Sequence, residues 1–420
     1  MMLKTHYFGA GMKSIVVNGG LPLSGKISVA GSKNAALPIL FATILTRGIS
    51  SIEGLPDIGD VRCALRILRD FGAQISKDGV RTMIDTTHLS YAPPAPDAVC
   101  RIRASTYLIG SCLSRFGECE LLDFGGCNFS ARPIDLHILA AQTLGAVREG
   151  ERLLADKLCG GEIVFPKPSV GATVNAILLA ACAEGESVIR GFAKEPHIDS
   201  LIDYLRSAGA EIQRTEDEIV IEGRELHGGE ISIPGDMIEA GTYLSLGLVT
   251  DGEISVEGCP IAHLSSVAEA LLAFGAEILV EGGTVRVRRG KTLRKAEIVA
   301  APYPGFPTDL QPIFAVVAAC LLGGVITDTV WRSRFGYLDS LSRFGVKYRV
   351  DDNRATLFPS RFSPASARSP DLRGGMACIM AALIARGESV IESAQTVERG
   401  YEKLVEKLCS IGANVVMREE

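Results

Sequence analysis

The stretch Leu68-Arg69-Asp70-Phe71-Gly72-Ala73 reads as the end of a helix, closed by glycine and a small residue before a β-prone run. Glycine suits the left-handed position just past a helix end. The same phrase recurs at intervals of about 64 to 73 residues, so nearly the whole chain uses one supersecondary unit six times. The other copies are Leu144-Gly145-Ala146, Ala208-Gly209-Ala210, Phe274-Gly275-Ala276, Phe344-Gly345-Val346 and Ile411-Gly412-Ala413.

A second sequence pattern recurs along the chain with the same spacing as the first. It is a turn glycine followed by alternating polar and apolar residues, as in Gly185-Glu186-Ser187-Val188-Ile189, and alternation with period two predicts a strand. Between units lie stretches too apolar on all sides for a surface helix, as at residues 170–182, 238–249 and 313–322. We therefore predict an α/β protein of six units, each with a strand, a loop, a helix and a second, central helix, arranged as two sets of three.

Composition agrees with a large α/β protein, since 420 residues with 47% apolar content can bury ample core. The net charge of −6 argues against a general nucleic-acid or anionic-membrane surface. No apolar run is long enough for a bilayer span, and eleven cysteines without a Cys-x-x-Cys pair favour free thiols in a reducing compartment. We expect a cytoplasmic protein without a metal site, a Ser-His-Asp triad or a Walker-type phosphate loop.

Polar and cationic residues gather where strands and loops pass into helices. Helix N-termini offer free N–H groups and the positive end of a dipole, so cations placed there indicate anion-binding sites. Ser32, Ser169, Thr308, Asp236 and Asp371 fit equally well as helix caps, and the arginines fit as solvated surface charge. Recurrence at equivalent points of a repeat favours a common functional face. The candidates are Lys33, Asn34, Arg101, Arg103, Arg132, Lys167, Ser169, Glu195, Asp309, Arg334, Arg373 and Arg399.

The loop that contains Cys127 is the longest of the six strand-to-helix loops and reads Gly125-Gly126-Cys127-Asn128-Phe129-Ser130-Ala131-Arg132-Pro133. A long Gly-Gly loop is a candidate lid. Most cysteines are buried small hydrophobes, but one placed five residues from an arginine in a polar loop is a candidate for an accessible thiol with a lowered pKa.

Several specific stretches, in order along residues 16–408, resemble the enolpyruvyl transferase family, and within it the branch that acts on UDP-N-acetylglucosamine in peptidoglycan precursor synthesis. The stretches are Gly31-Ser32-Lys33-Asn34-Ala35-Ala36-Leu37-Pro38, Gly125-Gly126-Cys127 with Ala131-Arg132-Pro133-Ile134-Asp135-Leu136-His137, Lys167-Pro168-Ser169-Val170-Gly171-Ala172-Thr173, Phe306-Pro307-Thr308-Asp309-Leu310-Gln311, and Glu398-Arg399-Gly400-Tyr401-Glu402.

The resemblance implies a fold of two inside-out α/β barrels, each of three repeats around buried helices. Residues 33–234 would form one lobe with the nucleotide-binding segments and the Cys127 loop. Residues 1–32 and 235–420 would form the second, discontinuous lobe, and the active site would lie in the cleft between them.

The implied reaction transfers the enolpyruvyl group of phosphoenolpyruvate to the 3-hydroxyl of UDP-N-acetylglucosamine and releases phosphate through a tetrahedral ketal. A phosphate and a carboxylate close together require converging cations, with arginine favoured for bidentate contact. The resemblance implies no metal or organic cofactor, and small-molecule substrates only. For phosphoenolpyruvate, the resemblance assigns Lys33, Arg103, Arg132 and Arg399 to the phosphate, and Arg334 and Arg373 to the carboxylate. For catalysis, it assigns Asp309 as the general base, and Cys127 as the general acid or as an aid to product release.

For the acceptor nucleotide, the resemblance assigns the sugar to Asn34, Asp309 and Val330. It assigns uracil to Arg132, Pro133, Ile134, Asp135 and Leu136, and the diphosphate to Lys167, Ser169, Val170 and Gly171.

The chain departs from the family pattern near the acceptor side. Met237 stands where the family has Arg, Trp331-Arg332-Ser333 where it has Phe-Glu-Asn, and Tyr337 where it has His. Near Met376 the family has smaller, Ala-rich residues. Such changes of charge alter selectivity. A specialised enolpyruvyl transferase that acts on another uridine nucleotide is therefore the main alternative. Two further alternatives are the sister enzyme that acts on shikimate 3-phosphate and a non-catalytic sensor of nucleotide sugars.

Overall fold

All six glycines predicted at helix ends have left-handed backbone in the computed structural model, which describes residues 13–122, 124–125 and 132–419. Their φ angles run from 89° at Gly345 to 102° at Gly145 and Gly209. In four copies the residue after the glycine donates its N–H to the carbonyl five residues back, as Ala73 does to Leu68 at 3.0 Å. This bond satisfies a carbonyl that the helix end leaves open, so the prediction of a left-handed glycine just past each of these helix ends is confirmed.

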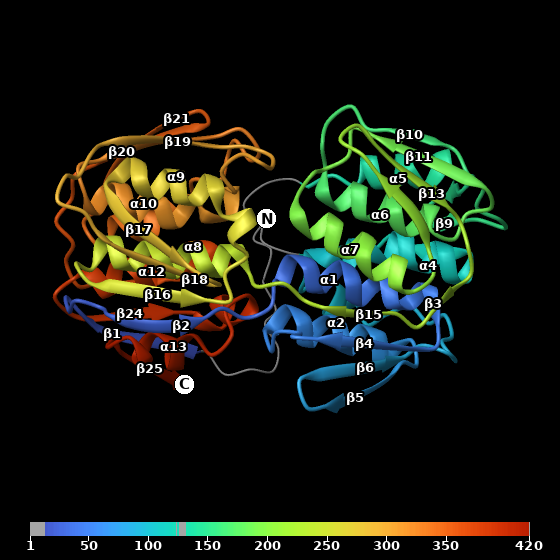
Figure 1. Cartoon of the computed structure of the whole chain (residues 1–420), viewed down its shortest axis with the longest axis horizontal. Coiled ribbons are helices and arrows are strands. Elements are labelled where there is room, and N and C mark those ends of the chain that lie inside the picture. The colour runs from blue at the N-terminus through green and yellow to red at the C-terminus, as the bar shows by residue number, and fades with distance from the viewer. Residues whose placement is uncertain (1–12, 123, 126–131, 420) are drawn as a thin grey trace. The chain divides into compact units, whose positions relative to one another are not determined.

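The chain divides into two compact units. The first unit comprises Val29–Met237 together with Ala301–Gly305, and the second comprises the described residues up to Ser28, Ile238–Ala300 and the described residues from Phe306 onward. The segment Ala301–Gly305 thus belongs to the first unit, although the sequence-based division placed it in the second lobe. In Figure 1 the first unit runs mostly from blue to green and the second mostly from yellow to red.

The first unit contains two four-stranded sheets, one three-stranded sheet and a strand pair, ordered β15-β4-β6-β5, β10-β11-β13-β12, β7-β9-β8 and β14-β3. Its strands are β3 (Thr46–Arg47), β4 (Ile49–Glu53), β5 (Gln74–Asp78), β6 (Arg81–Asp85), β7 (Glu118–Glu120), β8 (Val147–Glu149), β9 (Arg152–Leu154), β10 (Glu162–Val164), β11 (Glu186–Arg190), β12 (Glu211–Arg214), β13 (Glu218–Glu222), β14 (Leu226–His227) and β15 (Glu230–Ser232). Its helices are α1 (Lys33–Ala42), η1 (Thr43–Leu45), α2 (Gly59–Asp70), α3 (Pro96–Val99), η2 (Arg103–Tyr107), α4 (Leu108–Phe116), α5 (Asp135–Thr143), α6 (Val170–Ala180) and α7 (Pro196–Ser207).

The second unit contains three four-stranded sheets, ordered β17-β18-β16-β2, β19-β20-β22-β21 and β23-β24-β1-β25. Its strands are β1 (Lys13–Gly19), β2 (Gly25–Ser28), β16 (Glu253–Glu257), β17 (Ala276–Glu281), β18 (Thr284–Arg289), β19 (Ala296–Ala300), β20 (Gly324–Asp328), β21 (Lys347–Asp351), β22 (Arg354–Phe358), β23 (Ser366–Arg368), β24 (Gly387–Glu392) and β25 (Asn414–Glu419). Its helices are α8 (Met237–Val249), η3 (Ile261–His263), α9 (Ser265–Phe274), η4 (Thr308–Leu310), α10 (Gln311–Cys320), α11 (Tyr337–Ser342), α12 (Leu372–Ile384), η5 (Ala394–Arg399) and α13 (Leu404–Ser410).

The four-stranded sheets share one pattern, in which a strand that follows a turn glycine pairs in parallel with one neighbour and antiparallel with the next. For example, β11 is parallel to β10 and antiparallel to β13. In the last sheet β1, from the start of the described chain, supplies the antiparallel strand between β24 and β25. Figure 1 shows this dark blue strand beside the red ones.

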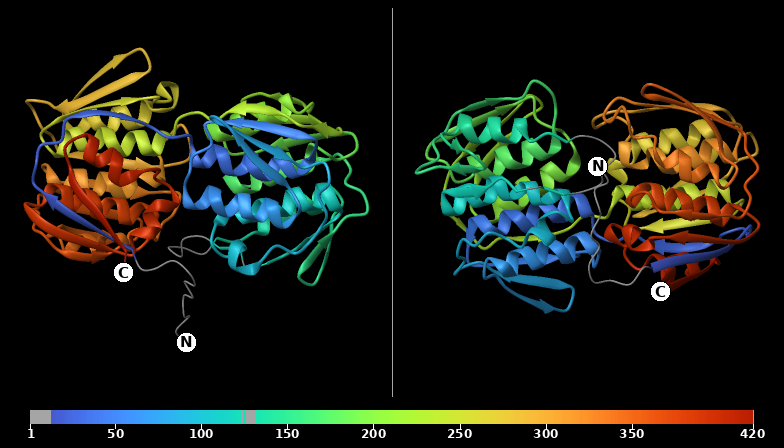
Figure 2. Two further views of the ribbon diagram at one scale, coloured as in Figure 1. Left: turned by 90° about the horizontal axis from the view of Figure 1, so that it is seen from below. Right: turned by 180° about the vertical axis from the view of Figure 1, so that it is seen from behind.

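The helices predicted to be apolar on all sides are buried. Every residue of α6 from Ala172 onward is buried, as are almost all residues of α8, α10 and α12. Figures 1 and 2 show helices inside each unit with strands around them. Side chains also bond from one helix to another, as Ser114 Oγ on α4 does when it donates to the Leu178 carbonyl on α6 at 3.1 Å. Across the described residues, no helix has the length and hydropathy of a membrane span.

Candidate functional site

Lys33 begins α1 and contacts two buried acidic residues, one through its backbone and one through its side chain. Its backbone N–H donates to Asp236 Oδ2 at 3.0 Å, and its ammonium Nζ lies 3.3 Å from Asp60 Oδ2. Ser32 caps the helix, since its hydroxyl accepts a bond from the Ala35 N–H. Asn34 follows in the first turn. The ammonium predicted to bind phosphate is therefore preorganised at a helix N-terminus, where the dipole adds to its charge.

Asp60 is a functional candidate that the sequence reasoning missed. It lies in the first turn of α2, and only 3% of its surface is exposed. Its position four residues before Ala64 and eight before Leu68 puts a carboxylate on the apolar face of an amphipathic helix. A charge in that place requires a partner, so the helical pattern contained a usable signal.

Arg103, predicted to bind phosphate, begins η2 and contacts the backbone on both sides of the Cys127 loop. Its guanidinium donates to the Phe124 carbonyl at 3.4 Å and to the Arg132 carbonyl at 2.5 Å. Burial lowers the pKa of Arg103 from its usual value. Cys127 itself lies outside the described residues. The structure thus shows Arg103 fixing the two ends of the segment that carries the candidate acid.

The residues predicted to bind the nucleotide come together at the first turns of α5 and α6. Arg132, Pro133 and Ile134 lead into α5, which begins with Asp135 and Leu136, and Lys167 precedes α6. Ser169 caps α6 by accepting the Ala172 N–H, with Val170 and Gly171 next in the chain. The two turns are in contact, because a Cβ added to Gly171 would lie 2.8 Å from His137 Cε1 on α5.

In the second unit, Asp309 lies between two arginines that the sequence assigned to the phosphoenolpyruvate carboxylate. Arg334 Nη1 is 2.9 Å from Asp309 Oδ1, and Arg373 Nη2 is 3.0 Å from Oδ2. Both guanidinium groups are buried, whereas 28% of the Asp309 side chain is exposed. The arrangement presents one accessible carboxylate beside two fixed cations, which keep it ionised and therefore without a proton.

Asp328, at the end of β20, ties the loop of Asp309 to that of Val330. Its Oδ1 accepts the N–H groups of Val330 and Trp331 at 2.9 and 2.8 Å, and its Oδ2 accepts the Thr308 hydroxyl at 2.6 Å. Thr308 therefore serves this network, and its suggested role as a helix cap was wrong. The carboxylate is completely buried.

Arg399 ends η5, which packs against α12, the helix of Arg373. Two residues further on, the Tyr401 ring centroid lies 5.4 Å from the Arg373 guanidinium carbon, within range of a cation–π contact. The Glu398-to-Glu402 stretch thus lies beside the Asp309 cluster in the same unit.

The departures from the family pattern also have places in the structure. Arg332 forms an exposed ion pair with Asp352 at 2.9 Å. Met237 is the first residue of α8, and Trp331 sits in the turn held by Asp328. The charge of Arg332 is thus offset by a neighbour in solvent.

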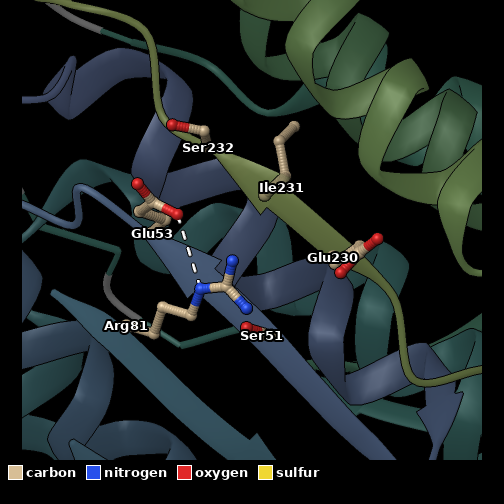
Figure 3. Close-up of a pocket in the computed structure, with 6 residues that line it drawn as sticks. All are labelled: Ser51, Glu53, Arg81, Glu230, Ile231 and Ser232. Atoms are coloured by element: carbon tan, nitrogen blue, oxygen red, sulfur yellow. Dashed lines mark ion pairs between the residues drawn. The ribbon is translucent and has the colours of Figure 1, made fainter. Parts of the chain in front are cut away.

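A hollow on the sheet face of the first unit is lined by none of the residues predicted to bind substrate. Figure 3 shows it along β4 and β15, with the ion pair between Arg81 and Glu53 across part of it. Both partners of that pair are solvent-exposed, so it has little electrostatic strength. We assign no role to this hollow. Within the described ranges no group of three or more His, Cys, Asp or Glu residues is arranged to hold a metal ion.

Comparisons with known proteins show which family the chain belongs to. The family model described as EPSP synthase (3-phosphoshikimate 1-carboxyvinyltransferase) matches residues 17–408. The chain belongs to this family, the enolpyruvyl transferases. Curated enolpyruvyl transferases resemble it over nearly their full length. The chain is 38% identical over 417 residues to UDP-N-acetylglucosamine 1-carboxyvinyltransferase 3 of Caldanaerobacter subterraneus, covering 97% of this chain and 100% of that one. It is 39% identical to the UDP-N-acetylglucosamine 1-carboxyvinyltransferase of Methylacidiphilum infernorum, covering 96% and 98%.

Solved structures agree on the fold. The enolpyruvyl transferase NikO from Streptomyces tendae matches with a TM-score of 0.88 at 25% identity, covering 98% of this chain and 100% of that one. EPSP synthase from Acinetobacter baumannii matches with a TM-score of 0.73 at 19% identity, covering 97% and 100%, and shows the fold alone.

Proposed function

We propose that this enolpyruvyl transferase moves the enolpyruvyl group of phosphoenolpyruvate to the 3-hydroxyl of UDP-N-acetylglucosamine, in peptidoglycan precursor synthesis. The observation that carries the proposal is the Asp309 cluster, an accessible carboxylate held by two buried arginines. The names of the curated relatives, which match along almost the whole chain, support the choice of acceptor.

In the proposed reaction Asp309 accepts the proton of the sugar hydroxyl while the hydroxyl oxygen bonds to C2 of phosphoenolpyruvate. Cys127 delivers a proton to C3, which gives the tetrahedral ketal. The C2–O bond to phosphate then breaks, C3 returns a proton to the Cys127 thiolate, and the departing phosphate takes the proton held by Asp309, so that the enol ether and phosphate leave. Lys33, Arg103, Arg132 and Arg399 hold the phosphate, while Arg334 and Arg373 hold the carboxylate.

For the acceptor, we propose that Asn34, Asp309 and Val330 bind the sugar. Residues 132–136 bind uracil, and Lys167 with Ser169, Val170 and Gly171 binds the diphosphate. The contact between the first turns of α5 and α6 supports this grouping, because it brings the uracil and diphosphate segments together.

We further propose that the repeated sheets form two inside-out barrels, each of three repeats around buried helices. The common strand order of the five four-stranded sheets and the six left-handed glycines support this arrangement. A shared active site between the lobes and a cytoplasmic location remain predictions from the sequence.

A second candidate is an enolpyruvyl transferase that acts on a different uridine nucleotide. Trp331-Arg332-Ser333 favours it, since this turn adjoins Val330, a proposed ligand of the acceptor sugar. The likeness to NikO, also named an enolpyruvyl transferase, is compatible with it.

A phosphate-release assay separates these possibilities. Phosphoenolpyruvate is supplied with UDP-N-acetylglucosamine, with other uridine diphosphate sugars, or with shikimate 3-phosphate in parallel. We expect the highest kcat/KM for UDP-N-acetylglucosamine. A preference for another nucleotide would support the second candidate, a preference for shikimate 3-phosphate would place the chain in the sister branch, and no release with any acceptor would indicate a sensor.

Alkylation tests the proposed role of Cys127. A phosphonate epoxide of the fosfomycin type should label this thiol first, because the adjoining cations would bind the phosphonate and stabilise the thiolate. Labelling should be faster with UDP-N-acetylglucosamine present. Peptide mapping after brief treatment gives the position of the label. Buried Cys378 is a built-in comparison, since burial raises the pKa of its thiol to about 12. Modification elsewhere, with turnover lost, would remove Cys127 from the site.

A further inference from the structure

Asn175, on α6, is completely buried, and its side-chain amide bonds to three segments of the first unit. Its Oδ1 accepts the Gly110 N–H of α4 at 2.6 Å. Its Nδ2 donates to the Thr106 carbonyl of η2 at 3.0 Å and lies 2.6 Å from His137 Nδ1 on α5. A buried amide of this kind could simply satisfy core backbone groups. The identity of the three segments suggests more.

The network determines which nitrogen of His137 carries the proton. Because the Gly110 N–H points at Oδ1, the amide orientation is fixed and Nδ2 must be the donor toward the ring. His137 Nδ1 therefore accepts, and the proton of the neutral imidazole resides on Nε2. Burial, and then the charge of Arg103, lower the pKa of His137 to about 4, which agrees with a neutral ring at pH 7.

The ring edge that carries the protonated Nε2 lies against the first turn of α6. A Cβ built on Gly171 would be 3.1 Å from His137 Nε2, so only glycine leaves room for the ring in its present place. Gly171 belongs to the segment proposed for the diphosphate. The other segments that meet at Asn175 begin with Arg103 and with Asp135, which are proposed for phosphate and uracil.

We propose that Asn175 is a positioning residue, which holds the ligand-bearing segments η2 and α5 in register with its own helix α6 and fixes His137 as the Nε2–H tautomer against Gly171. It contacts no substrate and acts through the segments that it joins. The inference rests on the proposed function, since those segments matter only if they bind the nucleotide.

The first test needs no variant. Long-range proton–nitrogen NMR of the full chain with labelled histidine should show, for His137, an unprotonated Nδ1 and a protonated Nε2 at pH 7. The opposite tautomer, or a protonated ring, would overturn the inference whatever the chain binds.

The second test is Asn175→Asp, which keeps the shape and the acceptor for Gly110 but removes both donors. The ring should then protonate at Nδ1 toward the new carboxylate. The dissociation constant for UDP-N-acetylglucosamine, measured by calorimetry, should rise about tenfold, the scale of one lost buried hydrogen bond. Ser114→Ala is the matched control, because it removes a bond between α4 and α6 further from their first turns. It should leave affinity unchanged.

The outcomes separate the inference from the function. A wild-type chain that binds no nucleotide would overturn both. If the wild type binds and Asn175→Asp binds equally well, or if Ser114→Ala weakens binding as much, the inference alone fails. Should Asn175→Asp not fold, His137→Leu tests the same contact, since it removes the ring that Asn175 orients and should weaken binding; unchanged affinity would contradict the inference. In a double-mutant cycle, His137→Leu should remove most of the effect of Asn175→Asp on affinity, and full additivity would contradict action through His137.

Discussion

Asp309→Asn should lower kcat for enolpyruvyl transfer by about 10²-fold or more, the usual scale for loss of a general base. The amide cannot accept the proton of the sugar hydroxyl. The substitution also replaces the carboxylate that both Arg334 and Arg373 contact by a neutral group. Steady-state phosphate release gives kcat, and calorimetry with UDP-N-acetylglucosamine should show that nucleotide binding survives.

Asp352→Asn is the control for this experiment. Asp352 also pairs with an arginine of the second unit at 2.9 Å, but in solvent, and its left-handed backbone is one that asparagine tolerates. Its kcat should equal that of the wild type. Near-normal turnover in Asp309→Asn would leave Asp309 as a structural partner of the two arginines and remove the base from the proposed mechanism.

Lys407→Met should reduce the free energy of unfolding of the second unit by about 3–5 kcal/mol, because it removes the cation that pairs with a buried carboxylate. Lys407 Nζ lies 2.7 Å from Glu239 Oε1, and the Glu239 side chain is only 2% exposed. Methionine keeps the length of the side chain but cannot offset the carboxylate. The midpoint of urea unfolding, followed by circular dichroism, measures the loss.

Lys26→Met provides the comparison, since Lys26 pairs with Glu257 at the same 2.7 Å in the same unit. That pair is solvent-exposed, so its removal should change the midpoint little. Equal effects of the two substitutions would show that burial of Glu239 contributes nothing to the difference.

The mixed α/β class, the helix ends and the buried helices could be predicted because their determinants are local and repeated. A glycine that must adopt positive φ after a helix is visible in the chain at Gly72 and at Gly412 alike. Uniformly apolar runs such as α6 gave the buried helices, although α6 ends at Ala180, before the predicted residue 182. The fine boundary depends on tertiary packing, which periodicity does not contain.

The site could be predicted only in part. Lys33 and Asp309 were candidates from the sequence, but Asp60 and Asp328 were not. Asp60 pairs with Lys33, and Asp328 accepts the hydroxyl of Thr308 beside Asp309, and these contacts exist only once the fold brings the residues close. Asn175 reads as one polar residue in an apolar helix. Nothing local shows that it bonds to three other segments, since those bonds exist only in the folded unit.

The Arg103 guanidinium donates hydrogen bonds to backbone carbonyl oxygens on either side of the Cys127 loop, and every amino acid has such an oxygen. Hydrogen bonds to backbone carbonyl groups do not depend on the identity of the side chains between the two bonded residues. Substitution of Cys127 or its neighbours therefore leaves both of these contacts available. In the proposed mechanism the residue that delivers the proton can thus evolve separately from the residue that anchors its loop.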